Sequence, residues 1–477
     1  MGKNDRSAAP TGQLDIDGVR RGDRALVIHP ELRQASRAAS GPGRSPEARL
    51  AEACGLAHAI DLNIVAAEVV RLNAAKPATL IGGGAVERLH EVIEAEDIGV
   101  VVIDGAVTPV QQRNLEKAWN AKVIDRTGLI LEIFGERART REGQLQVELA
   151  ALSYQRSRLV RSWTHLERQR GGYGFLGGPG ESQLEIDRRL IDERMVRIKH
   201  DLEDVRRTRG LHRRARQRVP YPIVALVGYT NAGKSTLFNR LTRSDVFAKD
   251  LLFATLDPTM RRVSLPSGRD IILSDTVGFI SDLPTELVAA FRATLEEVLE
   301  ADLLLHVRDV SHPETEAQKA DVEHVLQGLG IEMPAVSDDG MPVESPNILE
   351  VLNKIDLMEA ELRQRLADQA ERDPRLIPIS AITGDGCDEL LTKIEHYLAA
   401  NRLVVTYQLG HDRGSAVSWL YQHGEVLERA DTDDAAELTV RLSPMDVERF
   451  ERLHGSGAHG SNGGTGGGPI ADGERLS

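Results

Sequence analysis

The stretch VALVGYTNAGKSTLFNRL, residues 224–241, decides the fold of the central part of this chain. A short apolar run leads into Gly228, and after four further residues Gly233, Lys234 and Ser235 open an apolar pattern with helical spacing. Glycines in this arrangement let successive backbone N–H groups point at a phosphate, and the N-terminus of the following helix adds positive potential. The stretch therefore predicts a strand, a phosphate-binding loop and a helix.

Two side chains of this loop have definite tasks in such a site. Lys234 would pair with β- and γ-phosphate oxygens, and Ser235 would be a ligand of Mg²⁺. The alternative, a glycine-rich turn beside an unrelated lysine, is disfavoured because an apolar strand precedes the loop and a helical pattern follows it. The expected nucleotide contacts are Gly228, Tyr229, Thr230, Asn231, Ala232, Gly233, Lys234, Ser235 and Thr236.

The base that the loop serves is decided further along the chain. The stretch LEVLNKIDLM ends an apolar strand and carries Asp356, whose carboxylate can accept hydrogen bonds from both N1–H and the N2 amino group of guanine. Adenine offers no such pair of donors, so a dry pocket with this acid would disfavour adenine by a factor of about 10⁴. Lys354 would lie along the base and the phosphate-binding loop. The expected base contacts are Asn353, Lys354, Asp356, Ser380 and Ala381.

Two segments between these motifs are expected to respond to the γ-phosphate. In IILSDTVGFI a strand delivers Asp275, which would hold Mg²⁺ through a water molecule, and the N–H of Gly278 could bind the γ-phosphate. Upstream, LLFATLDPT offers Thr255 as the hydroxyl that reaches Mg²⁺, with Thr259 as its rival. The expected metal ligands are Ser235, Thr255 and Asp275. The catalytic candidates are Lys234, Thr255 and Gly278.

Phe279 stands where many GTPases carry a glutamine that orients the attacking water. A phenyl ring cannot orient water by hydrogen bonding. Hydrolysis by the protein alone should therefore be slow, near 10⁻⁴ per second in order of magnitude, until a partner completes the site. The alternative for Phe279 is a core position beside Ile280.

The remaining sequence predicts a multidomain α/β protein. Strands such as ATLIG and IGVVVID alternate with the helices AVERLHEVIEA and PVQQRNLEKAWN, which indicates an N-terminal domain with a parallel sheet. Near the end, strand, helix, strand, strand and helix follow one another. The expected regions are a disordered extension (1–24), an α/β domain (25–138), a helical hairpin arm (139–220), a GTP-binding domain with a mostly parallel sheet (221–400), a small α+β domain (401–453) and a disordered Gly-rich tail (454–477).

The arm is predicted from two apolar stripes with heptad-like spacing. Helices of about 28 residues would make an antiparallel hairpin roughly 40 Å long, joined by the glycine-rich tip RGGYGFLGGPGE. Aromatic side chains at such a tip could stack on unpaired bases, while arginines hold phosphates. The alternative is a solvated coiled coil with a mobile loop. The expected RNA contacts are Arg168, Arg170, Tyr173, Phe175, Arg188 and Arg189.

Charge is distributed unevenly along the chain. The net charge is -14, yet residues 156–218 hold 17 Lys and Arg against 9 Asp and Glu. Such a segment can meet a polyanion while the acidic remainder keeps the protein soluble. No apolar run is long enough for a membrane helix, and the start lacks the apolar core of a signal peptide, so we expect a cytoplasmic protein.

The motifs GYTNAGKS, FATLDPT, DTVGF, NKID and SAITG, in this order, resemble the translation-factor-related class of GTPases and, within it, the HflX family. The resemblance covers about residues 25–450. It implies binding to the large ribosomal subunit, with the arm pointing toward the peptidyl transferase centre, and splitting or rescue of idle or stalled ribosomes under stress. The acidic insert IEMPAVSDDGMPVESPN, residues 331–347, is longer than the family pattern and is expected to be a surface loop.

Two other kinds of function are kept as alternatives. One is an RNA-dependent ATPase or helicase acting through the N-terminal domain, since the family has been credited with ATP binding there. Gly82, Gly83 and Gly84 could cradle a phosphate, although they lack the full dinucleotide spacing and favour a tight turn before a helix. The other is a passive module that binds GTP on the ribosome. The expected ligands are GTP, GDP and Mg²⁺, and a monomer is the default.

Overall fold

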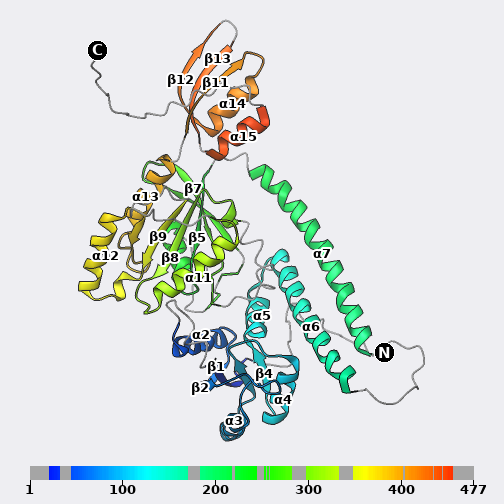
Figure 1. Ribbon diagram of the computed structural model, residues 1–477. Helices are drawn as coiled ribbons and strands as arrows, with labels where there is room; N and C mark the ends of the chain where they lie inside the picture. Colours follow the sequence, from blue (N-terminus) through cyan, green and yellow to red (C-terminus); the bar gives the residue numbers. More distant parts are fainter. Residues whose placement is uncertain are drawn as a thin grey trace, which may run out of the picture. The chain divides into compact units, whose positions relative to one another are not determined.

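The computed structural model describes twelve stretches of the chain in two compact units (Figure 1). One unit comprises residues 1–215 and 223–390, and the other comprises 216–222 and 391–477. For several arm residues, chiefly 160–169 and 208–216, only the backbone is described. No described helix is long and apolar enough to cross a bilayer. The described residues are 21–32, 44–169, 183–216, 221–243, 252–253, 255–256, 258–281, 297–331, 347–400, 403–432, 435–442 and 444–454.

The N-terminal part of the first unit contains a parallel sheet with strand order β2-β1-β3-β4. All four residues of β3 are buried, as expected for a parallel strand covered on both faces. The strands are β1 (Arg24–Leu32), β2 (Asn63–Leu72), β3 (Val100–Ile103) and β4 (Lys122–Asp125). The helices are α2 (Pro46–Ala59), α3 (Gly83–Ala95), α4 (Pro109–Trp119) and α5 (Arg126–Arg137).

One strand expected here is wrong. ATLIG forms no strand, and the second strand of the sheet is β2, which lies earlier in the chain. Lys76 and Leu80 pair only in an isolated bridge, and Leu80 has a left-handed backbone with φ 64°, which breaks an extended run. Gly82 is the N-cap of α3, and a Cβ on Gly82, Gly83 or Gly84 would meet nothing within 4 Å. These glycines therefore open a helix without a close neighbour.

The predicted hairpin arm is present as two long helices, α6 (Arg141–Gln169) and α7 (Gln183–Arg216). With 29 residues α6 has the expected length of about 28, and with 34 residues α7 is longer. Ion pairs Arg141–Asp201 and Glu148–Arg194 run in opposite directions along the two helices, so the helices are antiparallel. Their shared core consists of Leu145, Ile198 and Leu202, with Leu149, Leu152 and Val205 packed against it.

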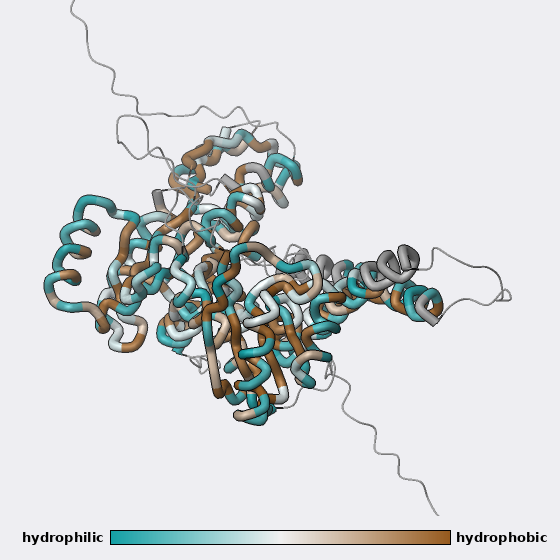
Figure 2. Tube along the Cα trace, turned by 60° about the horizontal axis from the view of Figure 1, so that its bottom comes forward, coloured by the Kyte–Doolittle hydropathy of each residue, from teal (hydrophilic) through white to brown (hydrophobic). Residues whose placement is uncertain are grey.

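The central part of the chain contains a six-stranded sheet of order β10-β9-β8-β5-β7-β6, which is parallel except for the β6–β7 pair. In Figure 2, hydrophobic residues gather in the inner segments of the trace, and hydrophilic residues predominate on its outer segments. The strands are β5 (Ile223–Val227), β6 (Thr259–Ser264), β7 (Asp270–Asp275), β8 (Leu303–Asp309), β9 (Ile348–Asn353) and β10 (Leu376–Pro378). The helices are α8 (Lys234–Thr242), α11 (Thr315–Gly328), η1 (Ile355–Leu357), α12 (Ala360–Arg372) and α13 (Cys387–Ala400).

The C-terminal part contains a three-stranded antiparallel sheet of order β11-β13-β12 with two helices, in the order that the sequence predicts. Burial alternates along β13 because only one face of this sheet packs on a core. That core includes Tyr407, Leu420 and Phe450. The elements are β11 (Leu403–Gly410), α14 (Gly414–His423), β12 (Glu425–Asp431), β13 (Ala435–Leu442) and α15 (Pro444–His454).

Candidate functional site

The phosphate-binding loop connects β5 to α8 and fits closely against its neighbours. Gly228 has φ 150° and Gly233 has φ 93°, in the region that favours glycine. A Cβ at Gly228 would clash with the carbonyl oxygen of Val307, and one at Gly233 would clash with the side-chain amide of Asn353. Both glycines are therefore needed where the loop approaches β8 and β9.

Lys234 lies inside this loop with 6% of its surface exposed. Its Nζ donates hydrogen bonds to the carbonyl oxygens of Gly228 at 3.1 Å and Tyr229 at 2.7 Å. Burial lowers the pKa of Lys234 to about 8, while the negative charge of Asp275 acts in the opposite direction. Among the described residues, the ammonium group donates to two neutral carbonyls and forms no salt bridge.

Three oxygen-bearing side chains meet beside the lysine. The Oδ2 atom of Asp275 accepts hydrogen bonds from Ser235 Oγ at 2.7 Å and from Thr255 Oγ1 at 2.9 Å, and the two hydroxyls lie 2.9 Å apart. Thr259 begins β6 and pairs with Asp275 through the backbone. The structure thus brings Thr255, rather than its rival, to the two other expected metal ligands.

These three side chains fit a magnesium ion. Mg²⁺ prefers hard oxygen ligands and is usually held by one or two carboxylates, with water and phosphate oxygens completing its shell. The other carboxylate oxygen, Asp275 Oδ1, is buried without a hydrogen-bond partner in the structure. Among the described residues, no group of three or more His, Cys, Asp and Glu side chains could hold a metal by itself. The site would therefore hold a metal ion only together with phosphate oxygens of a bound nucleotide.

Among the described residues, two further buried oxygens of the expected site have no hydrogen-bond partner: Thr230 Oγ1 in the loop and Asp356 Oδ1 in the base site. Outside the site, Thr315 Oγ1 and Tyr407 Oη are buried without a partner as well. A buried polar atom without a partner costs about 1–3 kcal/mol, so such atoms are rare unless a ligand completes them. Thr230, Asp275 and Asp356 lie in the three motifs assigned to phosphate, metal and base, respectively. A bound guanine base would donate hydrogen bonds to Asp356. A magnesium ion beside the phosphates would bind Asp275.

The expected base residues come together at the ends of β9 and β10. Asn353 donates from Nδ2 to the carbonyl of Ala232 at 2.8 Å and accepts from the N–H of Ala381 at 2.9 Å, so it joins the loop to the segment after β10. Lys354 has φ 69° and forms an ion pair with Asp309 at 2.7 Å. Ser380 is fully buried, and its Oγ accepts from the N–H of Thr383 at 3.1 Å.

The segment after Asp275 lies directly against the phosphate-binding loop. The N–H of Phe279 donates to the Gly228 carbonyl at 3.1 Å, and the Phe279 carbonyl accepts from the N–H of Thr230 at 2.7 Å. A Cβ at Gly278 would lie 2.8 Å from the Cα atom of Thr230, so only glycine fits there. The Phe279 side chain is 3% exposed and belongs to the main hydrophobic core, which confirms the core alternative for this residue.

A polar network links this segment to the N-terminal domain, and the sequence analysis missed it. The Tyr229 hydroxyl accepts from Arg44 and from the N–H of Ser281, both at 2.7 Å, and donates to Glu52. Arg126 donates to the carbonyl and hydroxyl of Ser281 at 2.9 and 3.0 Å. No local motif signals these contacts, since Arg44 and Tyr229 are 185 positions apart.

Residues just before Thr255 also contact the N-terminal domain. The ring of Phe253 packs edge-on against Phe134 of α5 with centroids 4.9 Å apart. A Cβ at Gly55 of α2 would lie 3.0 Å from the side-chain Cδ1 atom of Leu252, so the Leu252 side chain packs against the backbone of α2 at this point. The N-terminal domain therefore contacts residues next to Thr255 as well as residues next to Gly278.

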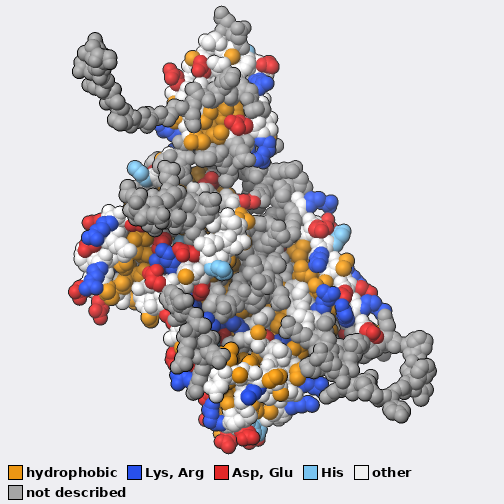
Figure 3. All heavy atoms as spheres, in the orientation of Figure 1, with side chains coloured by type: hydrophobic (Ala, Val, Ile, Leu, Met, Phe, Trp, Pro, Cys, Tyr) orange, Lys and Arg blue, Asp and Glu red, His pale blue; other side chains and the backbone are white. Residues whose placement is uncertain are grey.

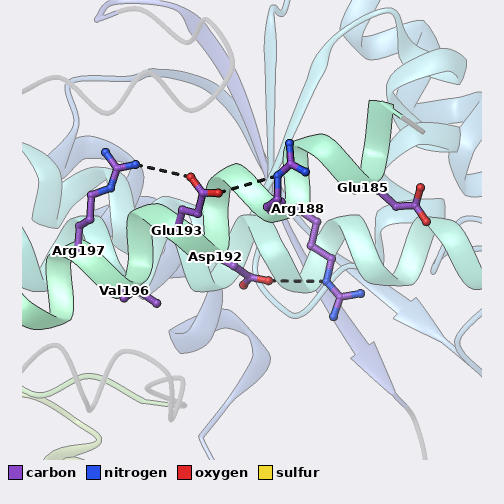
Figure 4. Close-up of a pocket in the computed structure, with 7 residues that line it drawn as sticks. Glu185, Arg188, Asp192, Glu193, Val196 and Arg197 are labelled. Atoms are coloured by element: carbon purple, nitrogen blue, oxygen red, sulfur yellow. Dashed lines mark ion pairs between the residues drawn. The ribbon is translucent and has the colours of Figure 1, made fainter. Parts of the chain in front are cut away.

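Only part of the expected RNA-binding set is described. Arg188 and Arg189 lie on α7, half-exposed, in weak ion pairs with Asp192 at 4.0 Å and Glu193 at 3.9 Å (Figure 4). A surface hollow of about 630 Å³ borders them, but α7 alone lines it, so it is a groove between helical turns. Side chains of both signs are mixed along the visible face of α7 (Figure 3). Arg168, Arg170, Tyr173 and Phe175 lie outside the described side chains.

The mainly parallel sheet, the loop between β5 and α8, and the buried oxygens at its end define a P-loop GTPase domain. Family models support this along most of the chain. They are described as GTP-binding GTPase N-terminal (residues 47–135), GTP-binding GTPase Middle Region (137–216), 50S ribosome-binding GTPase (223–337) and HflX C-terminal domain (365–463).

Two relatives with similar sequences agree with these models. The GTPase HflX of Magnetococcus marinus is 52% identical over 392 residues, which cover 82% of this chain and 87% of that protein. The GTPase HflX of Escherichia coli is 44% identical over 375 residues, 78% of this chain and 85% of that protein. A GTP-binding protein from Sulfolobus solfataricus in complex with GDP aligns over 79% of this chain and 98% of its own, with 21% identity and a TM-score of 0.42. The chain belongs to the HflX family of GTPases.

Proposed function

We propose that this GTPase, in its GTP-bound form, binds the large ribosomal subunit through its arm and splits or rescues idle or stalled ribosomes under stress. We also propose that it acts in the cytoplasm, where it would meet ribosomes. In this proposal GTP binding drives splitting, and hydrolysis times release. Mg²⁺, held by Ser235, Thr255 and Asp275, would neutralise charge on the phosphates.

One observation supports the proposal. Two adjacent residues where β4 meets α5 bind the arm and the segment after Gly278. Asp125 accepts hydrogen bonds from Tyr154 and Arg158 of α6, both at 2.6 Å. Arg126, the next residue, binds Ser281, which follows Gly278 by three positions. A shift of the switch segment on γ-phosphate binding would therefore act directly on the point where the arm is anchored.

The second feature that supports the proposal is the missing water-orienting group. Phe279 is buried in the core, and the side chain cannot hydrogen-bond to water. Hydrolysis then depends on a group supplied by a partner, as with GTPases that need an activating protein. A timer of this kind suits a protein that must stay bound until its task on the ribosome is complete.

Arm binding is tested by reversing charges on α7. We expect Arg188→Glu/Arg189→Glu to weaken binding to isolated large subunits in the GTP-analogue state by at least about tenfold, and to flatten its salt dependence. The matched control is Arg365→Glu/Arg372→Glu on α12, a helix with no buried residues, which changes net charge equally. Equal loss in both variants, or no loss in the arm variant, would contradict the proposed contact.

Splitting is tested with intact ribosomes and a non-hydrolysable GTP analogue. The proposal expects subunits to separate with the analogue, and the protein to remain on the large subunit because release needs hydrolysis. Sucrose-gradient profiles measure both results. Intact ribosomes after incubation with saturating protein and analogue would contradict the view that GTP binding supplies the energy.

A further inference from the structure

The loop expected to contact guanine is tied to the helix that carries the phosphate-binding lysine. Arg240 lies on α8, six residues after Lys234. Its Nε donates to the carbonyl oxygen of Ala381 at 2.6 Å, and its Nη2 donates to the carbonyl oxygen of Ile382. A Cβ at Gly384, where φ is 99°, would lie 2.7 Å from Arg240 Nη1, so the loop closes tightly on the guanidinium.

Ala381 is thereby held from both sides. Its N–H donates to Asn353 Oδ1, and its carbonyl accepts from Arg240, so both of its backbone groups have fixed partners. Ala381 is 3% exposed, whereas the next residue, Ile382, is 66% exposed. Arg240 therefore binds the loop after β10 at the point where the chain leaves the core. This point lies next to the residues expected at the guanine edge.

We propose that Arg240 is a positioning residue for guanine recognition. By holding the loop to α8, it fixes the spacing between the base end and the phosphate end of the pocket. Arginine suits this task because its planar group presents separate donors to two successive carbonyls, whereas a lysine is a single point charge. The inference rests on the proposed assignment of residues in the GTP site and adds a residue that does not touch the nucleotide.

Calorimetry on the full chain with two probes, GTP and inorganic tripolyphosphate, tests this role. Tripolyphosphate occupies only the phosphate end. We expect Arg240→Met to weaken GTP binding about tenfold, through faster dissociation, while tripolyphosphate binding stays unchanged. Arg240→Lys should recover part of the loss, since one carbonyl can still be held. The control Arg243→Met, at the exposed C-cap of the same helix, should change neither affinity.

Three results would overturn the inference. Equal losses for GTP and tripolyphosphate in Arg240→Met would show a damaged phosphate-binding helix rather than a displaced loop. Unchanged GTP binding would show that the loop keeps its place without Arg240. Wild-type protein that binds ATP as tightly as GTP would contradict the guanine assignment itself. Because this measurement needs no variant, it separates that failure from a failure of the role of Arg240.

Discussion

Lys234 combines a buried position with neutral carbonyl partners, and this has a consequence for nucleotide binding. Burial lowers its pKa to about 8 in the nucleotide-free protein. Phosphate oxygens would raise that pKa, because a nearby anion favours the charged form. Below pH 8 the ammonium is charged in both states, so this group adds little pH dependence. Above pH 8 binding must take up a proton.

We therefore expect the dissociation constant for GTP to rise about tenfold per pH unit above pH 8, until the pKa of the complex is reached. Calorimetry at pH 9 in two buffers with different ionisation enthalpies measures the protons taken up. The expected uptake approaches one proton per GTP at pH 9. No uptake at pH 9 would contradict the lowered pKa of Lys234.

Replacing Thr255 and replacing Thr259 should affect the magnesium requirement of GTP hydrolysis differently. Thr255→Val removes a hydroxyl that contacts both Ser235 and Asp275, so we expect the Mg²⁺ concentration needed for half-maximal GTP hydrolysis to rise about tenfold. Thr259→Val, at the first position of β6, keeps that cluster and should stay near wild type. Magnesium titrations of hydrolysis compare the two variants, and a larger effect at Thr259 would reverse the assignment.

At this scale the sequence predicts local chemistry better than distant contacts. The grouping of Ser235, Thr255 and Asp275 follows from motifs that lie at the ends of neighbouring elements. The role of Tyr229 does not, because its partners Arg44 and Glu52 come from another domain. Arg240 escapes notice for a similar reason: its two partners are backbone carbonyls, which carry no sequence signal.

Among the elements, the arm root depends on one buried carboxylate. Asp125 is 4% exposed, caps α5 by accepting from the N–H of Gly128 at 2.8 Å, and also holds Tyr154 and Arg158. Asp125→Ala would lose the cap and leave a half-buried arginine without its anion. We expect a loss of about 3–5 kcal/mol in the first unfolding transition in urea.

Tyr154→Phe is the matched control because it removes a single hydrogen bond to the same carboxylate. It should cost only about 1 kcal/mol in the same transition. If the two variants lose equal stability, Asp125 does not anchor the arm in the way described.

The elements themselves show which sequence signals are dependable. Apolar heptad spacing predicted both arm helices, because the shared core of α6 and α7 is formed by that stripe. The ATLIG run predicts a strand wrongly, since five apolar or small residues are compatible with a turn as well. β2 alternates weakly and has only two buried residues, so its pattern was too faint to identify.

At the scale of the whole chain, contacts of the N-terminal domain connect the expected nucleotide site with the arm. The switch segments contact the N-terminal domain at Ser281 and Phe253, and the arm is anchored at Asp125 of the same domain. The N-terminal domain therefore contacts both the arm and the two segments that are expected to respond to the γ-phosphate. ATP binding by the N-terminal domain stays a prediction that is assigned to no particular residue.

The most direct test is single-turnover GTP hydrolysis by highly purified protein with and without isolated large subunits. Because Phe279 is packed in the core, we expect the protein alone to turn over GTP at about 10⁻⁴ per second, and large subunits to raise this by orders of magnitude. Rapid hydrolysis by the protein alone, or a slow rate that large subunits leave unchanged, would contradict the account.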